Sequence, residues 1–370
     1  MKTINLSALF LLLLLGCARQ TDNLQESLTV QMQSNAETHG LLAQAVLVKH
    51  NNNLLFAHAM GNTDISRGNP VTKDSIFPIF SLSKLFASTL LFQLVEQNKV
   101  NLDAPIGQYL EHLPKVWRPI PVALFLNHST GLPEYFDYDD KQVFAPNSID
   151  AAIQSLSNTP LQFKPNSATR YNQTNYLVIK LLLEKITKQS YSTLVQTRIL
   201  TPLKMHNTFI KGMNTAFKSV TAYLPNSGDA LQVNPYTFPT YANVHSDAYS
   251  NIHDLSVFLS ALINGELVAK PLLESLWQPA LLESGSKNYF VSGWEYEEVG
   301  NWQAVGHDGG GVLRVKLLFK ENMTDSIIVI YLTNGNLDGV WSRTLIKTIE
   351  SKVLPDRYSR FASWLGGLFD

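Results

Sequence analysis

Ser81 and Lys84 are the two residues whose types and spacing most directly suggest covalent chemistry. Ser81 follows a short apolar run, and an apolar helical pattern begins immediately after it. If Ser81 opens that helix, Lys84 lies one turn further along, on the same face. An amine kept partly neutral beside a serine hydroxyl can help remove its proton, and a helix N-terminus favours the negative charge that develops there. The spacing therefore predicts a serine nucleophile with a lysine partner.

This pair is a weak signal on its own, because S-x-x-K arises roughly once by chance in a chain of this length. Ser284 and Lys287 form a second copy, in a stretch rich in Gly and Ser that no apolar helix follows. We interpret the second copy as a loop and favour Ser81. A plain helix N-cap remains the alternative for Ser81.

Three further segments accompany Ser81 along the chain: Leu124–Pro133 (LFLNHSTGLP), Arg170–Tyr176 (RYNQTNY) and Gly306–Gly310 (GHDGG). Together with the Ser81 motif they resemble the serine β-lactamase superfamily, on its class C, esterase and penicillin-binding-protein-like branch. The resemblance runs from about residue 28 to about residue 350. It implies an α+β fold in which an antiparallel β-sheet is flanked by helices and an all-helical subdomain, at about residues 85–285, is inserted.

The hydrophobic periodicity agrees with that architecture. Strand-like runs occur near both ends of the chain, at residues 43–50, 54–59, 302–305, 312–319 and 326–333. Helical patterns lie between them, at residues 84–98, 174–188, 191–200 and 254–263. We therefore expect one sheet that is closed by N- and C-terminal strands.

The resemblance implies that Ser81 attacks a carbonyl to form an acyl-enzyme, that Lys84 lowers the barrier to its deprotonation, and that Tyr171 relays protons beside both. A phenol near cationic groups can be shifted toward its anion or can donate a proton to the leaving group. A solvated lysine and a core tyrosine are the alternatives. Gln173 stands where the family usually has asparagine and is one methylene longer, which leaves the substrate class open.

The third motif departs from true β-lactamases. His307 stands where they have a lysine that helps to bind the carboxylate of the drug, and histidine is mostly neutral at pH 7. This argues against dedicated β-lactamase activity, although a plain turn histidine is the alternative. Gly309 and Gly310 permit close approach of the substrate. The resemblance implies that the N–H groups of Ser81 and Gly310 form an oxyanion hole.

Residues around these motifs have less specific roles. His128 and Gly131 resemble family positions that shape the loop before the active site, and we interpret them as structural. Tyr135, Phe136 and Tyr138 follow that loop and either line the pocket or lie on a surface loop. Trp294 is expected in the core.

The N-terminus resembles a bacterial lipoprotein signal. Lys2 precedes an apolar run, Ile4 to Leu15, that is too short to span a bilayer and ends at Gly16-Cys17. We predict a signal peptide at 1–16, a lipid on Cys17, a tether at 17–27, the hydrolase domain at 28–360 and a tail at 361–370. Since Ala18 is not aspartate, the resemblance implies an exported protein at the outer membrane, facing the periplasm. A buried core helix is the alternative.

Composition excludes several other classes. The net charge of −1 comes with no basic patch, so we expect no nucleic-acid partner. The nine histidines form no H-E-x-x-H motif and no phosphate-binding loop is present, so neither a metal nor a cofactor is expected. Cys17 is the only cysteine, which excludes an intramolecular disulfide. The oligomeric state does not follow from the sequence.

The favoured hypothesis is a lipid-anchored serine hydrolase, esterase-like or peptidase-like, acting on a small-molecule or peptide acyl substrate. One alternative is a penicillin-recognising cell-wall enzyme, sensor or β-lactamase. The other is a non-catalytic binding protein on the same fold, against which the intact Ser81, Lys84 and Tyr171 speak.

Overall fold

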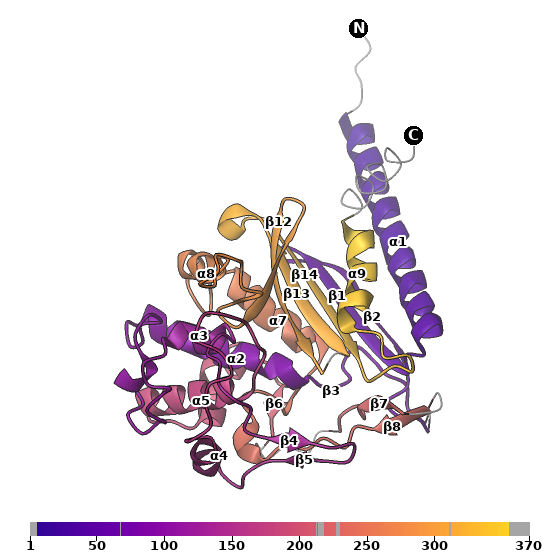
Figure 1. The fold of residues 1–370 in the computed structure, drawn as a ribbon. Coiled ribbons are helices and arrows are strands. Elements are labelled where there is room, and N and C mark those ends of the chain that lie inside the picture. The colour runs from indigo at the N-terminus through magenta and orange to yellow at the C-terminus, as the bar shows by residue number, and fades with distance from the viewer. Residues whose placement is uncertain are drawn as a thin grey trace, which may run out of the picture.

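A seven-stranded antiparallel sheet forms the centre of the computed structural model (Figure 1). The structure describes residues 6–66, 68–211, 213, 218–226, 230–310 and 312–354, with side chains from residue 23 onward, Asn226 apart. The strand order is β10-β11-β12-β13-β14-β1-β2. The strands are β1 (Ala43–His50), β2 (Asn53–Gly61), β10 (Phe290–Val291), β11 (Trp294–Val299), β12 (Trp302–Gly309), β13 (Leu313–Phe319) and β14 (Ser326–Thr333).

Strands from the N-terminal and C-terminal parts of the chain are neighbours in this sheet. β1 pairs antiparallel with β14, with Val48 opposite Val329. All eight residues of β14 are buried, because helices cover both of its faces, and this is why the strand has a continuous apolar sequence. Every strand-like run predicted from the sequence overlaps one of these strands. The predicted α+β fold class is confirmed.

Helices and short strands complete the fold (Figure 1). The helices are α1 (Leu6–His39), η1 (Phe80–Leu82), α2 (Ser83–Glu96), η2 (Ile106–Gln108), α3 (Val122–Leu126), α4 (Ile149–Ser155), α5 (Thr174–Thr187), α6 (Tyr191–Val195), η3 (Gln196–Leu200), η4 (Thr240–Ala242), α7 (Ile252–Ile263), α8 (Lys270–Leu276), η5 (Glu321–Met323) and α9 (Ser342–Val353). The remaining strands are β3 (Phe77–Pro78), β4 (Asp137–Tyr138), β5 (Val143–Phe144), β6 (Phe209–Ile210), β7 (Tyr223–Asn226), β8 (Ala230–Val233) and β9 (Ala248–Ser250).

Side chains alternate between the two faces of the sheet. On β1, Val46 and Val48 pack in the apolar cluster that contains residues of α1 and α9. Ala45 and Leu47 point to the opposite face, into the larger core shared with α2, α5 and α7. This alternation follows from the two-residue period of a strand. The larger core fixes the helical region against the sheet, and Trp294 lies within it as expected.

The N-terminal helix begins to pack before the predicted domain boundary at residue 28. Leu24, Leu28 and Met32 are spaced by four residues and contact the outer face of the sheet, with Leu28 and Met32 fully buried. α1 begins at Leu6 and includes residues 6–16 of the predicted signal peptide and the whole of the predicted tether. The side chain of Cys17 and the tail at 361–370 lie outside the described residues. Among the described residues, no helix is both long and apolar enough to cross a membrane.

Candidate active site

Ser81 lies in the short helical turn η1, between strand β3 and helix α2. The preceding residue, Phe80, has a φ of 44°, an uncommon conformation for a bulky side chain. The ring of Phe80 lies beside Gly310, where a Cβ atom would come within 3.1 Å of it and the φ is +56°. Glycine at position 310 therefore lets the end of β12 approach the turn that carries Ser81.

Lys84 lies one turn after Ser81 and is completely buried. Its Nζ atom donates hydrogen bonds to Ser81 Oγ at 3.1 Å and to the backbone carbonyl of His245 at 2.8 Å. Desolvation lowers the pKa of Lys84 well below its ordinary value of 10.5, and the nearby Glu134 only partly opposes this. Burial thus favours a neutral amine, which can accept a proton from the Ser81 hydroxyl.

Tyr171 faces the same two residues from the segment before α5. Lys84 Nζ lies 4.9 Å from the centroid of its ring. Although 38 % of Tyr171 is exposed, desolvation raises the pKa of its hydroxyl well above the ordinary value, and interactions with Ser81 and Gln173 oppose the rise only in part. Because burial disfavours the charged phenolate, the site favours a protonated Tyr171. Of the two roles considered for it, this supports the proton donor.

The loop beneath Tyr171 is shaped by two residues with left-handed backbone. His128 has a φ of 52° and packs against Tyr171, with ring centroids 4.6 Å apart. Its Nδ1 atom accepts a hydrogen bond from the Asn172 backbone at 3.2 Å. At Gly131, a Cβ atom would lie 2.2 Å from the carbonyl oxygen of Phe163. His128 therefore supports Tyr171 directly, whereas glycine at position 131 lets the loop pass close to the backbone of Phe163.

The sequence motifs do not identify two residues of this site, Glu134 and His245. Glu134 accepts backbone hydrogen bonds from Gln173 at 2.9 Å and Thr174 at 3.2 Å, so it caps the start of α5 from another segment. His245 supplies the carbonyl that holds Lys84, and its ring lies 2.8 Å from the hydroxyl of Tyr135. Neither contact is local in the chain, so no motif or spacing signals it.

His307 lies on β12 and is buried. Its Nδ1 atom is 2.7 Å from the backbone carbonyl of Asp308. Because that oxygen can only accept, Nδ1 carries the proton and Nε2 is the free acceptor. Desolvation lowers the pKa of His307 and outweighs the opposing effect of Glu295, so the ring is mostly neutral at pH 7. Within the described residues, His307 Nε2 and Gln173 Oε1 are buried without a hydrogen-bond partner.

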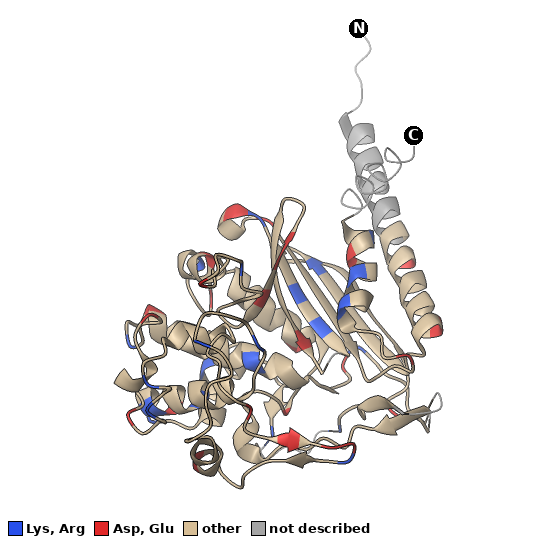
Figure 2. Cartoon of the chain, viewed as in Figure 1, with Lys and Arg blue, Asp and Glu red and all other residues tan. Residues whose placement is uncertain are grey.

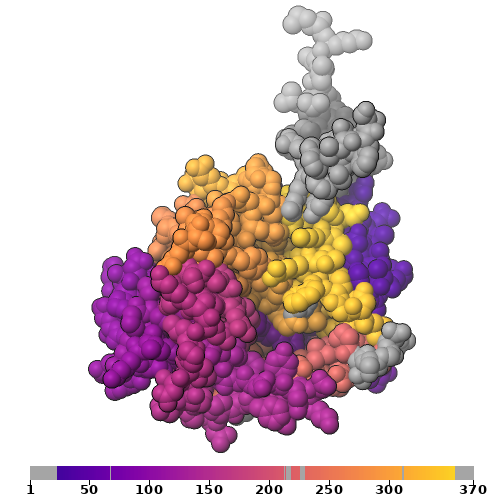
Figure 3. Space-filling view, viewed as in Figure 1, coloured from indigo at the N-terminus to yellow at the C-terminus, as the bar shows by residue number. Residues whose placement is uncertain are grey.

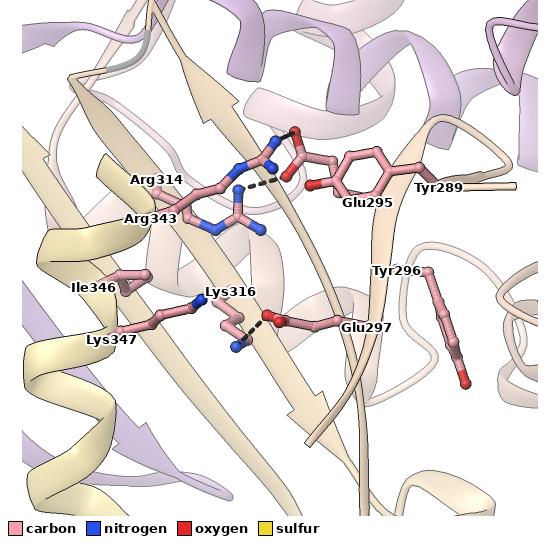
Figure 4. Close-up of a pocket in the computed structure, with 9 residues that line it drawn as sticks. All are labelled: Tyr289, Glu295, Tyr296, Glu297, Arg314, Lys316, Arg343, Ile346 and Lys347. Atoms are coloured by element: carbon pink, nitrogen blue, oxygen red, sulfur yellow. Dashed lines mark hydrogen bonds and ion pairs between the residues drawn. The ribbon is translucent and has the colours of Figure 1, made fainter. Parts of the chain in front are cut away.

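Asp308 anchors the strand that carries His307. It accepts hydrogen bonds from Arg314 at 2.8 Å, Ser342 at 2.6 Å and Arg343 at 2.6 Å. Burial alone would raise the pKa of Asp308, but Arg314 and its other partners hold it below the ordinary value. Arg314 and Arg343 also converge on Glu295, as Figure 4 shows. Figure 2 shows Lys and Arg residues, in blue, on the central strands of the sheet and on α9.

A cavity of about 840 Å³ opens at this place. Five of the predicted site residues line it: Ser81, Tyr171, Gln173, His307 and Gly310. Lys84 is buried behind Ser81 and contacts the Ser81 hydroxyl from there. The magenta helical region and the orange and yellow sheet region meet on the face shown in Figure 3.

The remaining predicted residues have other positions. Gly309 lies behind the cavity wall, where a Cβ atom would come within 2.6 Å of the carbonyl oxygen of Ile79. Phe136 and Tyr138 line the cavity, whereas Tyr135 contacts His245. In the described part of the chain, no group of three or more His, Cys, Asp or Glu side chains is placed to hold a metal ion.

The second S-x-x-K copy is not assembled into a site. Ser284 Oγ lies 2.7 Å from Ser286 Oγ, and Lys287 forms an ion pair with Glu298 at 2.7 Å. Both Ser284 and Lys287 are exposed. Ser81 therefore differs from Ser284 in having a buried amine in contact with its hydroxyl.

Comparison with known proteins identifies the family. The model of the Beta-lactamase family matches residues 26–343. The chain belongs to the Beta-lactamase family. This confirms the resemblance seen in the four sequence motifs, and the relatives found support a hydrolase activity.

Relatives within this family differ in their named activities. Penicillin-binding protein 4* of Bacillus subtilis (strain 168) is 24 % identical over 329 residues, which cover 82 % of this chain and 71 % of that protein. Teichoic acid D-alanine hydrolase of Staphylococcus aureus (strain MRSA252) is 27 % identical over 252 residues, 68 % of this chain and 61 % of that protein. The chain thus spans about three-fifths of the hydrolase.

A solved structure shares the fold. The D-amino acid amidase from Ochrobactrum anthropi SV3, complexed with L-phenylalanine amide, superposes with a TM-score of 0.74 at 21 % identity. The match covers 90 % of this chain and 99 % of the amidase chain. At this identity, the similarity demonstrates a common fold.

Proposed function

We propose that this protein is a serine hydrolase that forms an acyl-enzyme on Ser81 and hydrolyses an ester or an amide. The observation that carries the proposal is the buried Lys84 amine, which lies 3.1 Å from the Oγ atom of Ser81, a residue that lines a large cavity. A lysine that only stabilises the fold could form its hydrogen bonds far from any cavity. A buried amine in contact with a serine that lines a cavity is the arrangement that activates a nucleophile.

The first half of the reaction uses three groups. Neutral Lys84 accepts the hydroxyl proton of Ser81 as Oγ attacks the substrate carbonyl carbon. The N–H groups of Ser81 and Gly310 stabilise the oxyanion, a contribution worth about 100- to 1,000-fold in rate per donor. Tyr171 then donates its proton to the leaving group as the scissile bond breaks, and the Lys84 ammonium returns a proton to Tyr171. In the second half, water attacks the acyl-enzyme and releases Ser81.

The substrate class follows from the third motif and from the relatives. Neutral His307 offers no cation for a carboxylate, which favours esterase-like or peptidase-like activity over β-lactam hydrolysis. Relatives are named for hydrolysis of D-alanine from teichoic acid and of D-amino acid amides, and these names support an ester or amide bond.

The anchoring of the domain is a separate part of the proposal. Lys2, the apolar run and Gly16-Cys17 support a lipid on Cys17. Ala18, which is not aspartate, supports a position at the outer membrane, facing the periplasm. The Cys17→Ser variant, expressed in a Gram-negative host, should leave the membrane fraction or remain uncleaved. Cleaved variant that still partitions into detergent would contradict the lipid on Cys17.

The hydrolase proposal is tested by comparing two serines. Wild-type protein should hydrolyse p-nitrophenyl acetate, Ser81→Ala should lose this activity, and Ser284→Ala, the matched control, should keep it. Circular dichroism and thermal melting establish that each variant is folded. Full activity in folded Ser81→Ala would exclude Ser81 as the nucleophile.

A further inference from the structure

One wall of the cavity is a cluster of interlocked aromatic rings. Phe136 directly precedes β4 and Tyr138 lies in it, whereas Tyr236 and Phe238 come from the segment between β8 and η4. Phe136 meets Phe238 edge to face at 5.0 Å, and Tyr138 meets Tyr236 edge to face at 5.5 Å. We call these four residues the first aromatic wall.

The first aromatic wall is connected to the catalytic residues. Phe238 packs perpendicular to the ring of His245, with centroids 5.2 Å apart. The backbone carbonyl of His245 in turn holds Lys84. The wall is therefore positioned by the same segment that positions the amine, so a group bound against it lies near Ser81.

A second aromatic wall consists of Tyr171, Tyr289 and Phe290. Tyr171 and Phe290 are stacked, with centroids 5.8 Å apart and an angle of 25° between the rings. Tyr289 meets Phe290 edge to face at 5.1 Å. Trp341, which is 61 % exposed, also lines the cavity, from the residue before α9.

The charges that line the cavity are already paired. Glu295, Asp308 and Arg343 are its charged lining residues, and Arg343 contacts Asp308 at 2.6 Å and Glu295 at 3.0 Å. Arg343 also lies over the ring of Tyr289, 4.9 Å from its centroid, at the edge of the smaller charged pocket in Figure 4. The charged lining groups are thus paired with one another, and the remaining cavity surface that a substrate can contact is mainly aromatic.

The size of the cavity also favours a large substrate group. Its volume of about 840 Å³ is at the upper end of the range of roughly 300–1,000 Å³ that holds drug-sized ligands. An acetyl or alanyl group would contact little of either wall. Apolar surface that a substrate buries is worth about fourfold in binding per methylene.

We propose that the two aromatic walls bind a bulky apolar group, aromatic or medium-chain aliphatic, that lies next to the scissile bond of the substrate. This inference rests on the proposed hydrolase activity and specifies its substrate class. The apolar group belongs to the acyl part or to the leaving group, and the two arms of the experiment distinguish these.

In the first arm, the leaving group is constant and the acyl chain of p-nitrophenyl esters is lengthened from acetate to octanoate. In the second arm, the acetyl group is constant and the leaving alcohol is changed from methyl to benzyl and naphthylmethyl. We expect kcat/KM to rise at least tenfold across one arm. A rise in the first arm assigns the walls to the acyl group, and a rise in the second assigns them to the leaving group. A flat or falling series in both arms overturns the proposal.

Variants then test which residues are responsible, with the ratio of kcat/KM for the largest and smallest substrates as the readout. Phe238→Ala should lower this ratio about tenfold, and Phe238→Leu, which keeps apolar volume, should restore part of it. The matched control is Phe144→Ala, because Phe144 is half-exposed in the β4–β5 hairpin that carries Tyr138 and is not a lining residue. Equal ratios in Phe238→Ala and Phe144→Ala would contradict the proposal.

Two checks keep the outcomes separate. If Phe238→Ala does not fold, Tyr138→Ala takes its place, because Tyr138 belongs to the first aromatic wall and is largely exposed. A small fluorophosphonate reports whether Ser81 is reactive irrespective of the walls. Reaction with the probe and a flat substrate series would refute only the aromatic subsite, whereas no reaction would refute the proposed hydrolase itself.

Discussion

The Nζ atom of Lys84 lies 2.8 Å from the backbone carbonyl oxygen of His245, 161 residues away in the chain. This bond and the bond to Ser81 Oγ at 3.1 Å hold the amine in one position. Because a carbonyl oxygen can only accept, the amine directs one of its protons to His245. A neutral amine then has its lone pair available for the proton of Ser81.

The first prediction concerns this amine. Lys84→Met removes the base but keeps an unbranched side chain, so kcat for p-nitrophenyl acetate should fall about 100- to 10,000-fold. Lys84→Arg should not restore activity, because a guanidinium remains protonated. Lys287→Met, in the exposed second copy, is the matched control. The measurement is steady-state kinetics on variants whose melting curves match that of the wild type. If Lys84→Met retained most of the activity, Lys84 would not be the base.

The second prediction is the pH dependence. Activity requires a neutral Lys84 and a protonated Tyr171. Desolvation lowers the pKa of Lys84 and raises that of Tyr171. We expect kcat/KM to rise with pH through the lowered pKa of Lys84, and then to stay level until the pH approaches the raised pKa of Tyr171. An acid limb centred at 10.5, the ordinary value for lysine, would show that burial does not tune this residue.

The same shift has a consequence for stability. Between its lowered pKa and 10.5, Lys84 binds fewer protons in the folded chain than in the unfolded chain. Its contribution to the free energy of unfolding therefore rises with pH in that window. The free energies of unfolding of wild type and Lys84→Met, measured by denaturant melts at several pH values in this window, should therefore diverge as the pH rises.

The third prediction separates acylation of amides from that of activated esters. Tyr171→Phe removes the proton donor, so an amide substrate, whose leaving amine must be protonated, should lose about 100- to 10,000-fold in kcat. A p-nitrophenyl ester should lose far less, because nitrophenolate leaves without a proton. Tyr109→Phe is the control, since its hydroxyl accepts from the Asn101 backbone, away from the cavity. Equal losses for both substrates would argue for a structural role of Tyr171.

The fourth prediction concerns β-lactams. Because His307 is neutral, a carboxylate-bearing β-lactam lacks a charge-assisted hydrogen bond worth about 1.5–3 kcal/mol. Wild-type protein should therefore hydrolyse p-nitrophenyl butyrate far more efficiently than nitrocefin. His307→Lys should narrow that gap by raising kcat/KM for nitrocefin. A wild-type value for nitrocefin equal to that for the ester would indicate a working β-lactamase.

The fold was largely predictable because its strands have strong local signals. The apolar run at 326–333 became β14, whose burial on both faces explains its composition. The pattern at 191–200 was expected as one helix, but the structure continues α6 with a π-helical turn at Gln196–Leu200. Side-chain periodicity distinguishes these two helical forms poorly, since both keep residues of one face close together.

The candidate site was predictable only where motifs exist. Ser81, Tyr171, Gln173, His307 and Gly310 were found through segments with a recognisable order, and the structure brings them to one cavity. Glu134, His245 and the first aromatic wall act through contacts between distant segments. Tyr138 and Tyr236 lie on short hairpins or loops whose pairing is set by tertiary packing, so nothing in their local sequence shows that they meet.

The most direct test of the central claim is the identity of the acylated residue. Intact-mass analysis after treatment with a fluorophosphonate, followed by peptide mapping, should show one adduct per chain, on Ser81. The adduct should be absent in Ser81→Ala and unchanged in Ser284→Ala. An adduct that persists in Ser81→Ala, or that maps to Ser284, would contradict the assignment of Ser81 as the nucleophile.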